Sequence, residues 1–140
     1  MKKFVFSLQK VLDLREFEED KAKLELGKAV AEVERIKKLL KEIAENRVEA
    51  NLSRKDIKDI GILINIENYI TGLDIKKEKL LEELAYAQIV FEEKRDLFTK
   101  AIQEREVLTK LKEKQLSEYK KEILKEEENA VDDIINGKKN

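Results

Sequence analysis

A stripe of apolar residues with a seven-residue repeat most strongly limits what this chain can fold into. Its members are Ala22, Leu26, Ala29, Val33, Ile36, Leu40, Ile43 and Ala50. Residues spaced alternately by four and three positions lie on one side of an α-helix, and this spacing is typical of a coiled-coil seam. Extended backwards, the same frame passes through Arg15, Leu12, Leu8 and Val5. It predicts a first helix over about residues 3–50, on the order of 70 Å long.

The seam of this first helix is imperfect. Glu19 and Arg47 occupy positions that the frame assigns to the core, where a coiled coil normally places apolar residues. Ala22 and Ala29 are small, so a partner backbone can approach them closely. We therefore expect a thin coiled coil with charged interruptions.

The stretch over about residues 51–61 departs from the repeat and predicts a connection between two helices. It contains residues typical of turns and helix caps, namely Asn51, Ser53, Asp56, Asp59 and Gly61. Ser53 and Asp56 have the spacing of a capping box. We expect a short helical turn inside this connection.

A second helical stripe predicts a helix over about residues 62–135. Its members are Ile66, Ile70, Leu73, Leu80, Leu84, Ala87, Phe91, Phe98, Ala101 and Leu108. Phe91 and Phe98 lie one heptad apart and share a face, so we expect them to pack opposite the alanines of the first helix. Gly72, inside this helix, is expected to mark a local break or a site of close approach.

The second stripe thins after Leu108. Lys112 and Gln115 take the next core positions, followed by Tyr119. The second helix is expected to exceed the first by roughly 20 residues, which leaves its C-terminal part without a partner in the hairpin. Acidic residues near a helix C-terminus oppose the helix dipole, and this part contains Glu126, Glu127 and Glu128. The last turns are therefore expected to fray or to await another protein.

Composition supports an all-α fold. Charged residues make up 44% of the chain and aromatic residues only 6%, with no proline and four glycines, which suits a narrow seam better than a globular core. We predict one domain over residues 1–140, with two long helices in an antiparallel coiled-coil hairpin. Periodicity alone is also compatible with a dimer of long helices, but the connection favours a hairpin, and we expect a monomer.

Several kinds of chemistry are excluded by the residues that are missing. Without cysteine or histidine, the chain lacks the ligands of a zinc site and the base of a serine–histidine–aspartate triad. No glycine-rich phosphate loop is present. We predict a non-enzymatic protein without cofactor or metal. Near-zero net charge argues against nucleic-acid binding, and the lack of an apolar run of ~20 residues argues against membrane insertion. A cytoplasmic protein that binds through helical surfaces is the simplest interpretation.

Both ends of the chain carry motifs beyond the heptad repeat. The opening segment over residues 4–15 has an aromatic and leucine pattern, carried by Phe4, Phe6, Leu8, Leu12 and Arg15. The other end contains, in order, Leu108, residues 111–114, Tyr119, Glu128, Asn129 and Asp133. Both motifs resemble those of the flagellar FliJ family. Asn129 stands where the family usually has glutamine, and Ile134 stands where an acid is common. The resemblance spans essentially the whole chain.

This resemblance implies a function that composition does not. Proteins of this family are soluble parts of the flagellar type III export apparatus and resemble the central stalk subunit of rotary ATP synthases. The resemblance implies three partners: the hexameric export ATPase, the cytoplasmic part of the membrane-bound export gate, and export chaperones. It places the protein in the cytoplasm, peripherally associated with the inner face of the cell membrane at the flagellar base.

The resemblance also implies two binding sites. The paired ends of the chain are expected to contact the ATPase through Phe4, Phe6, Leu8, Leu12, Arg15 and Tyr119. The gate contact is expected early in the second helix, at Tyr69, Leu73 and Leu80, with Lys76 departing from the small residue usual there. Leu73 and Leu80 are also seam positions, so packing between the helices is an equally direct interpretation of both.

Two other functions share this fold. One is a structural or accessory-stalk coiled coil of another machine. The other is a cytosolic helical chaperone that clamps client helices without any ATPase.

Overall fold

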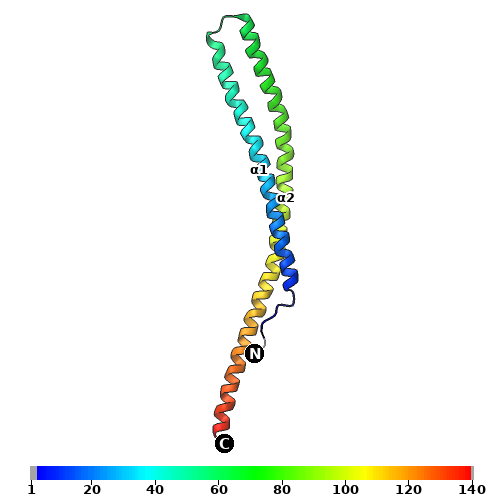
Figure 1. Cartoon of the computed structure of the whole chain (residues 1–140), viewed down its shortest axis with the longest axis vertical. Helices are drawn as coiled ribbons and strands as arrows, with labels where there is room; N and C mark the ends of the chain where they lie inside the picture. The colour runs from blue at the N-terminus through cyan, green and yellow to red at the C-terminus, as the bar shows by residue number, and fades with distance from the viewer. Residues whose placement is uncertain (1–2, 140) are drawn as a thin grey trace. The chain divides into compact units, whose positions relative to one another are not determined.

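Two long helices joined by a short connection make up the computed structural model, which describes residues 3–139 and side chains as far as residue 137 (Figure 1). Helix α1 covers Gln9–Ser53, a single 3₁₀ turn, η1, covers Arg54–Asp56, and helix α2 covers Ile60–Lys139. No strand occurs within residues 3–139. The prediction of an all-α helical hairpin is confirmed.

Contacts along the hairpin divide it into two units. The connection unit comprises Ala22–Phe98 and the base unit comprises Met1–Lys21 with Thr99–Asn140. In both units, residues later in α1 pair with residues earlier in α2, which is the order of an antiparallel pair. In the base unit Gln9 meets Lys112 and Glu19 meets Arg105. The expectation of one domain over residues 1–140 stays a prediction.

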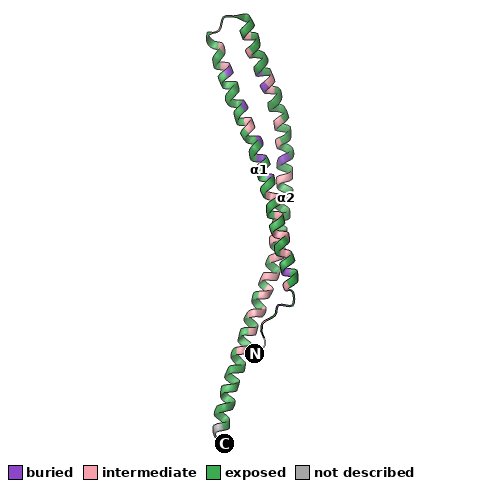
Figure 2. Cartoon of the chain, in the orientation of Figure 1, coloured by how far each residue is buried: buried purple, intermediate pink, exposed green. Residues whose placement is uncertain are grey.

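The core of the connection unit follows the heptad frame. Ile36 is 1% exposed and packs in a cluster with Val33 and Ala87. Partly buried apolar residues surround this cluster: Leu40, Leu80, Leu84 and Phe91. Figure 2 shows the buried positions as a narrow line on the facing sides of the two helices. Burying a side chain of this size stabilises the fold by about 1.5–3 kcal/mol, so the seam holds the unit together.

The start of α1 differs from the prediction. The helix begins at Gln9 rather than at residue 3, and residues 3–6 have no regular structure. The heptad frame places Val5 in the seam, but Val5 is 79% exposed while Phe6, outside the frame, is 5% exposed. An extended segment can direct Phe6 inward, and burying a phenyl ring removes more apolar surface than burying a valine. The N–H of Gln9 donates to the carbonyl oxygen of Phe6 at 3.0 Å, which closes the first turn.

The connection also differs in detail. α1 continues through Ser53, whose hydroxyl donates to the carbonyl oxygen of Glu49 at 2.8 Å instead of capping the next turn. The predicted capping box is therefore wrong. Asp59 caps α2, because its Oδ1 accepts from the N–H groups of Gly61 at 2.8 Å and Ile62 at 3.4 Å. The expected short helical turn is confirmed by η1.

Helix α2 is longer than predicted. It has 80 residues, whereas α1 has 45. The difference exceeds the predicted one because α1 begins at Gln9 rather than at residue 3 and α2 continues to Lys139. From residue 124 to residue 137 every residue is exposed. Helix α2 is continuous across Gly72, and apart from the neighbouring backbone of α2 itself no atom lies within 4 Å of the place that a Cβ would take. The expected break or close approach at Gly72 is therefore wrong.

Candidate partner-binding surfaces

Polar pairs fill the charged gaps in the seam. Arg105 of α2 donates to both carboxylate oxygens of Glu19, and this hydrogen bonding raises the pKa of the Arg105 guanidinium. In the connection unit, Arg47 donates to Asp74 at 2.9 Å, with the same effect on the pKa of Arg47. Each charged residue at a core position of α1 therefore has an opposite charge on α2. Such pairs are satisfied in one register and broken in others, so they specify alignment as well as contact.

Two more polar residues predicted at or near the seam are also paired in the base unit. Arg15 forms ion pairs with Glu104 of α2 at 2.8 Å and with Glu18 of its own helix at 3.0 Å. The ammonium of Lys112 donates to Oε1 of Gln9 at 2.7 Å. Arg15, expected at the ATPase end, therefore contributes to the pairing of the helices.

Phe4 of the opening segment lies against the C-terminal half of α2. The rings of Phe4 and Tyr119 are 5.5 Å apart with planes tilted by 46°, a geometry that aromatic pairs favour. A groove here is lined by Lys3, Phe4, Val5, Gln115, Glu118, Tyr119, Glu122, Ile123 and Glu126. Residues from both ends of the sequence thus form one mixed apolar and acidic surface.

The predicted ATPase-contact residues differ in accessibility. Phe6 and Leu12 are buried, and Phe4, Arg15 and Tyr119 are half-buried. Leu8 is exposed although the heptad frame assigns it to the seam. The structure therefore brings Phe4 and Tyr119 together and leaves Leu8 as the most accessible apolar residue of the set. The role of all six in partner binding stays a prediction.

The comparison with known protein families decides the classification. The family model described as "Flagellar FliJ protein" matches residues 3–136. The chain belongs to the flagellar FliJ family. It is therefore a protein related to flagellar export, and the match favours this prediction over an accessory stalk of another machine. No match was found among curated proteins or among solved structures.

The predicted gate site of this FliJ-family chain lies in the connection unit, and its three residues are not equivalent. Leu73 is buried in the seam, and Leu80 packs against the cluster of Val33, Ile36 and Ala87. Tyr69 is 50% exposed. Of the three, Tyr69 is therefore the residue that a partner can reach without separating the helices.

Tyr69 borders a shallow groove between the helices. The groove encloses about 340 Å³ and is lined by Asn46, Glu49, Ala50, Ser53, Ile62, Asn65, Ile66 and Tyr69. The heptad pattern does not single out Ile62, which is exposed in this groove, or the nearby exposed residues Ile60 and Ile64. A signal was present, because isoleucine occurs at every second position from Ile60 to Ile66. One helical stripe cannot bury all of these side chains, so some had to face solvent.

Other kinds of site find no support in the part of the chain that is described. Residues 3–139 contain no group of acidic, cysteine or histidine side chains arranged to hold a metal ion. Over the same residues, neither helix has a segment long and apolar enough to cross a bilayer.

Proposed function

We propose that this FliJ-family chain is a soluble, non-enzymatic stalk of the flagellar export apparatus, which inserts into the hexameric export ATPase and promotes its assembly and activity. The family match over residues 3–136 is the observation that carries this proposal. The antiparallel pairing of α1 and α2 supports it, because two paired helices can enter the central opening of a ring.

The base unit is the end that we propose for the ATPase. Its surface combines the paired rings of Phe4 and Tyr119 with the exposed side chain of Leu8. Aromatic residues are enriched where proteins bind one another. Phe6, Leu12 and Arg15 act in this proposal by holding the opening segment and the helices in place.

The connection unit is the end that we propose for the export gate. Tyr69 makes the contact in this proposal, with Ile62 beside it in the same groove. Leu73 and Leu80 act in this proposal from the seam, by holding α2 against α1. Binding would keep the chain in the cytoplasm, at the inner face of the membrane beneath the flagellum. We further propose that the chain acts as a monomer and also contacts export chaperones, without cofactor or nucleic acid.

ATP hydrolysis by the purified export ATPase of the same organism, with and without this chain, tests the ATPase proposal. A rise in rate at amounts of the chain well below those of the ATPase subunits supports a stalk shared by a ring. No change in rate, with both proteins folded, contradicts it.

Binding of the gate's cytoplasmic part to the wild-type chain and to Tyr69→Ala tests the gate proposal. Phe17→Ala is the matched control, because it removes an exposed aromatic side chain from α1, outside the proposed gate surface. Equal binding by wild type and Tyr69→Ala contradicts the proposed contact.

A further inference from the structure

The solvent face of α2 in the connection unit carries a second apolar stripe, separate from the seam. This outer stripe consists of Ile64, Ile75, Tyr86, Ile89 and Leu97, all exposed. Four of them recur every eleven residues, which corresponds to three helical turns and aligns them along the helix axis. At 3.6 residues per turn they lie about half a turn from Leu73 and Leu84, which contribute to the packing against α1. Packing within the hairpin therefore does not account for the outer stripe.

A groove beside Tyr86 extends the outer stripe toward α1. It encloses about 630 Å³ and is lined by Ala29, Glu32, Arg35, Glu82, Glu83, Tyr86, Ala87 and Val90. Ala29 and Ala87 are buried and form its floor, where small side chains leave a hollow that larger ones would fill. Tyr86, at the rim, is 70% exposed. The groove thus has the form of a socket for a large apolar side chain.

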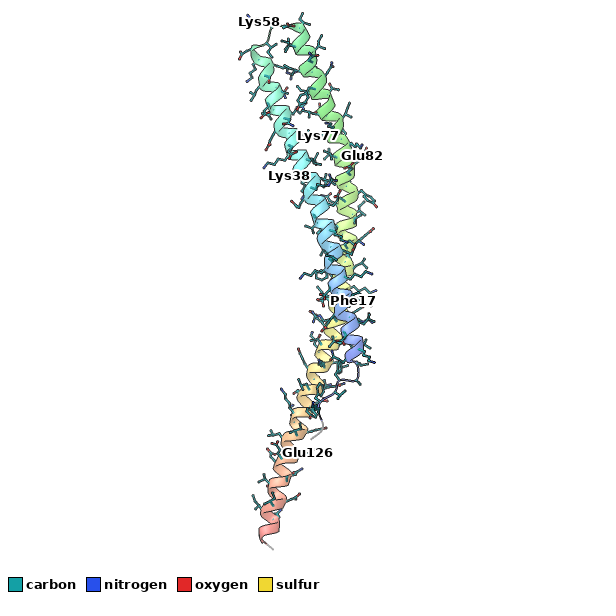
Figure 3. The ribbon with its side chains drawn as sticks, in the orientation of Figure 1. Phe17, Lys38, Lys58, Lys77, Glu82 and Glu126 are labelled. Atoms are coloured by element: carbon teal, nitrogen blue, oxygen red, sulfur yellow. The ribbon has the colours of Figure 1, made fainter. Side chains whose placement is uncertain are left out.

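Acidic side chains dominate the rim of this socket. Arg35 is the cation of the groove, and it is bound to Glu32 at 2.7 Å, which lowers the pKa of the Glu32 carboxyl. Glu82 (Figure 3) and Glu83 form no ion pair among the described residues, and the charge of Glu83 adds to the rise in the pKa of the Arg35 guanidinium that Glu32 causes. Farther along the outer stripe, Glu93 is also exposed. The neighbourhood of Tyr86 therefore carries net negative charge, although Lys79, one heptad away, is an opposing cation on this face.

We propose that the outer stripe and its groove bind an amphipathic α-helix of another protein, whose apolar side is flanked by lysine or arginine. From Ile64 to Leu97 the stripe is about 50 Å long, which suits an extended helix rather than a small molecule. A helix laid along it places apolar anchors at turn spacing, one of them in the socket at Tyr86. Its cations then face Glu82, Glu83 and Glu93. This surface goes beyond the proposed ATPase and gate contacts, which use other residues.

Two synthetic helical peptides of about three heptads test the proposal. They share one leucine seam and one tryptophan, and differ in carrying either lysine or glutamate on the flanks. The chain itself has no tryptophan, so the peptide's fluorescence reports binding without background. We expect saturable binding of the lysine peptide at least ~10-fold tighter than that of the glutamate peptide, weakening as salt rises.

Three variants distinguish specific binding at this surface from non-specific binding. Tyr86→Ala is expected to weaken binding of the lysine peptide about 10-fold, as loss of an interface anchor does. The double variant Glu82→Lys with Glu83→Lys is expected to invert the preference between the peptides. The matched control, Glu126→Lys with Glu127→Lys, removes equal charge from the base unit and is expected to leave the preference unchanged.

The proposal is overturned if neither peptide saturates, or if Tyr86→Ala binds as well as wild type. It is also overturned if sedimentation shows the chain alone forming dimers that Tyr86→Ala dissociates, because a second copy would then occupy the stripe. Circular dichroism confirms that each variant keeps its helical content, so loss of binding is not loss of fold.

Discussion

Arg105 of α2 holds Glu19 of α1 through two hydrogen bonds, at 2.6 Å and 3.3 Å, at a position that the heptad frame reserves for an apolar side chain. The pair lies across the antiparallel seam of the base unit. Replacing Glu19 by lysine is expected to lower the midpoint of thermal unfolding by several degrees, because two cations then face each other. Exchanging both residues, in Glu19→Lys with Arg105→Glu, is expected to restore part of the loss. Circular dichroism during heating measures both effects.

The control for this exchange is Glu34→Lys, an exposed change on α1. It is expected to shift the midpoint little. If Glu34→Lys and Glu19→Lys lower it equally, the Glu19–Arg105 pair has no special role in the seam.

Ile36 is the most deeply buried residue of the connection unit. Ile36→Ala is expected to cost about 2–5 kcal/mol of the free energy of unfolding, because it removes buried methylene groups and leaves a cavity. Ile75→Ala makes the same chemical change at an exposed position and is expected to stay within about 0.5 kcal/mol of wild type. Urea titration gives both values. Equal costs would contradict the seam as described.

The N-terminal cap of α2 is a further test of the connection. Asp59→Ala removes the acceptor for the N–H groups of Gly61 and Ile62 and is expected to cost about 0.5–2 kcal/mol of unfolding free energy. Ser53→Ala is expected to cost less, because the Ser53 hydroxyl bonds to a carbonyl within α1 and caps nothing. If urea titration gave a larger cost for Ser53→Ala than for Asp59→Ala, this would support the capping box that the sequence suggested.

The ring contact between Phe4 and Tyr119 ties the opening segment to α2. A double-mutant cycle with Phe4→Leu and Tyr119→Leu is expected to give a coupling of about 0.5–1.5 kcal/mol beyond the area buried. Chemical denaturation of the four proteins supplies the cycle. A coupling of zero would mean that the two rings contribute independently.

The seam could be predicted from the sequence because it depends on local spacing. Ile36, Ile43 and Leu73 are buried where the heptad frames place them. From the sequence, Glu19 and Arg47 look like defects in the seam. Their partners, Arg105 and Asp74, can be identified only when the register between the two helices is known. Pairing of distant segments is information that one helix's periodicity does not contain.

The ends of the helices were harder to predict for the same reason. Residues 3–8 leave the helical conformation because this allows Phe6 to be buried. Such tertiary packing is not contained in the heptad pattern. At the connection, Ser53 and Asp59 are both good capping residues, and the competing bond from Ser53 to Glu49 decides between them.

The candidate sites were partly predictable. The resemblance to the family pointed to Tyr69, which lies off the stripe, and Tyr69 is exposed. For Leu73 and Leu80, the sequence could not distinguish packing in the seam from contact with a partner, because both roles require an apolar side chain. The outer stripe escaped notice because its eleven-residue spacing differs from the seven-residue spacing of the seam.

Site-specific cross-linking to the export ATPase tests the stalk proposal most directly. The chain has no cysteine, so Leu8→Cys and Leu52→Cys each provide a single exposed attachment point, in the base unit and near the connection. With a photoreactive group at each position, we expect cross-links to the assembled ATPase ring from residue 8 and few from residue 52. Cross-links from residue 52 alone, or from neither position under conditions in which the ring assembles, would contradict insertion of the base end.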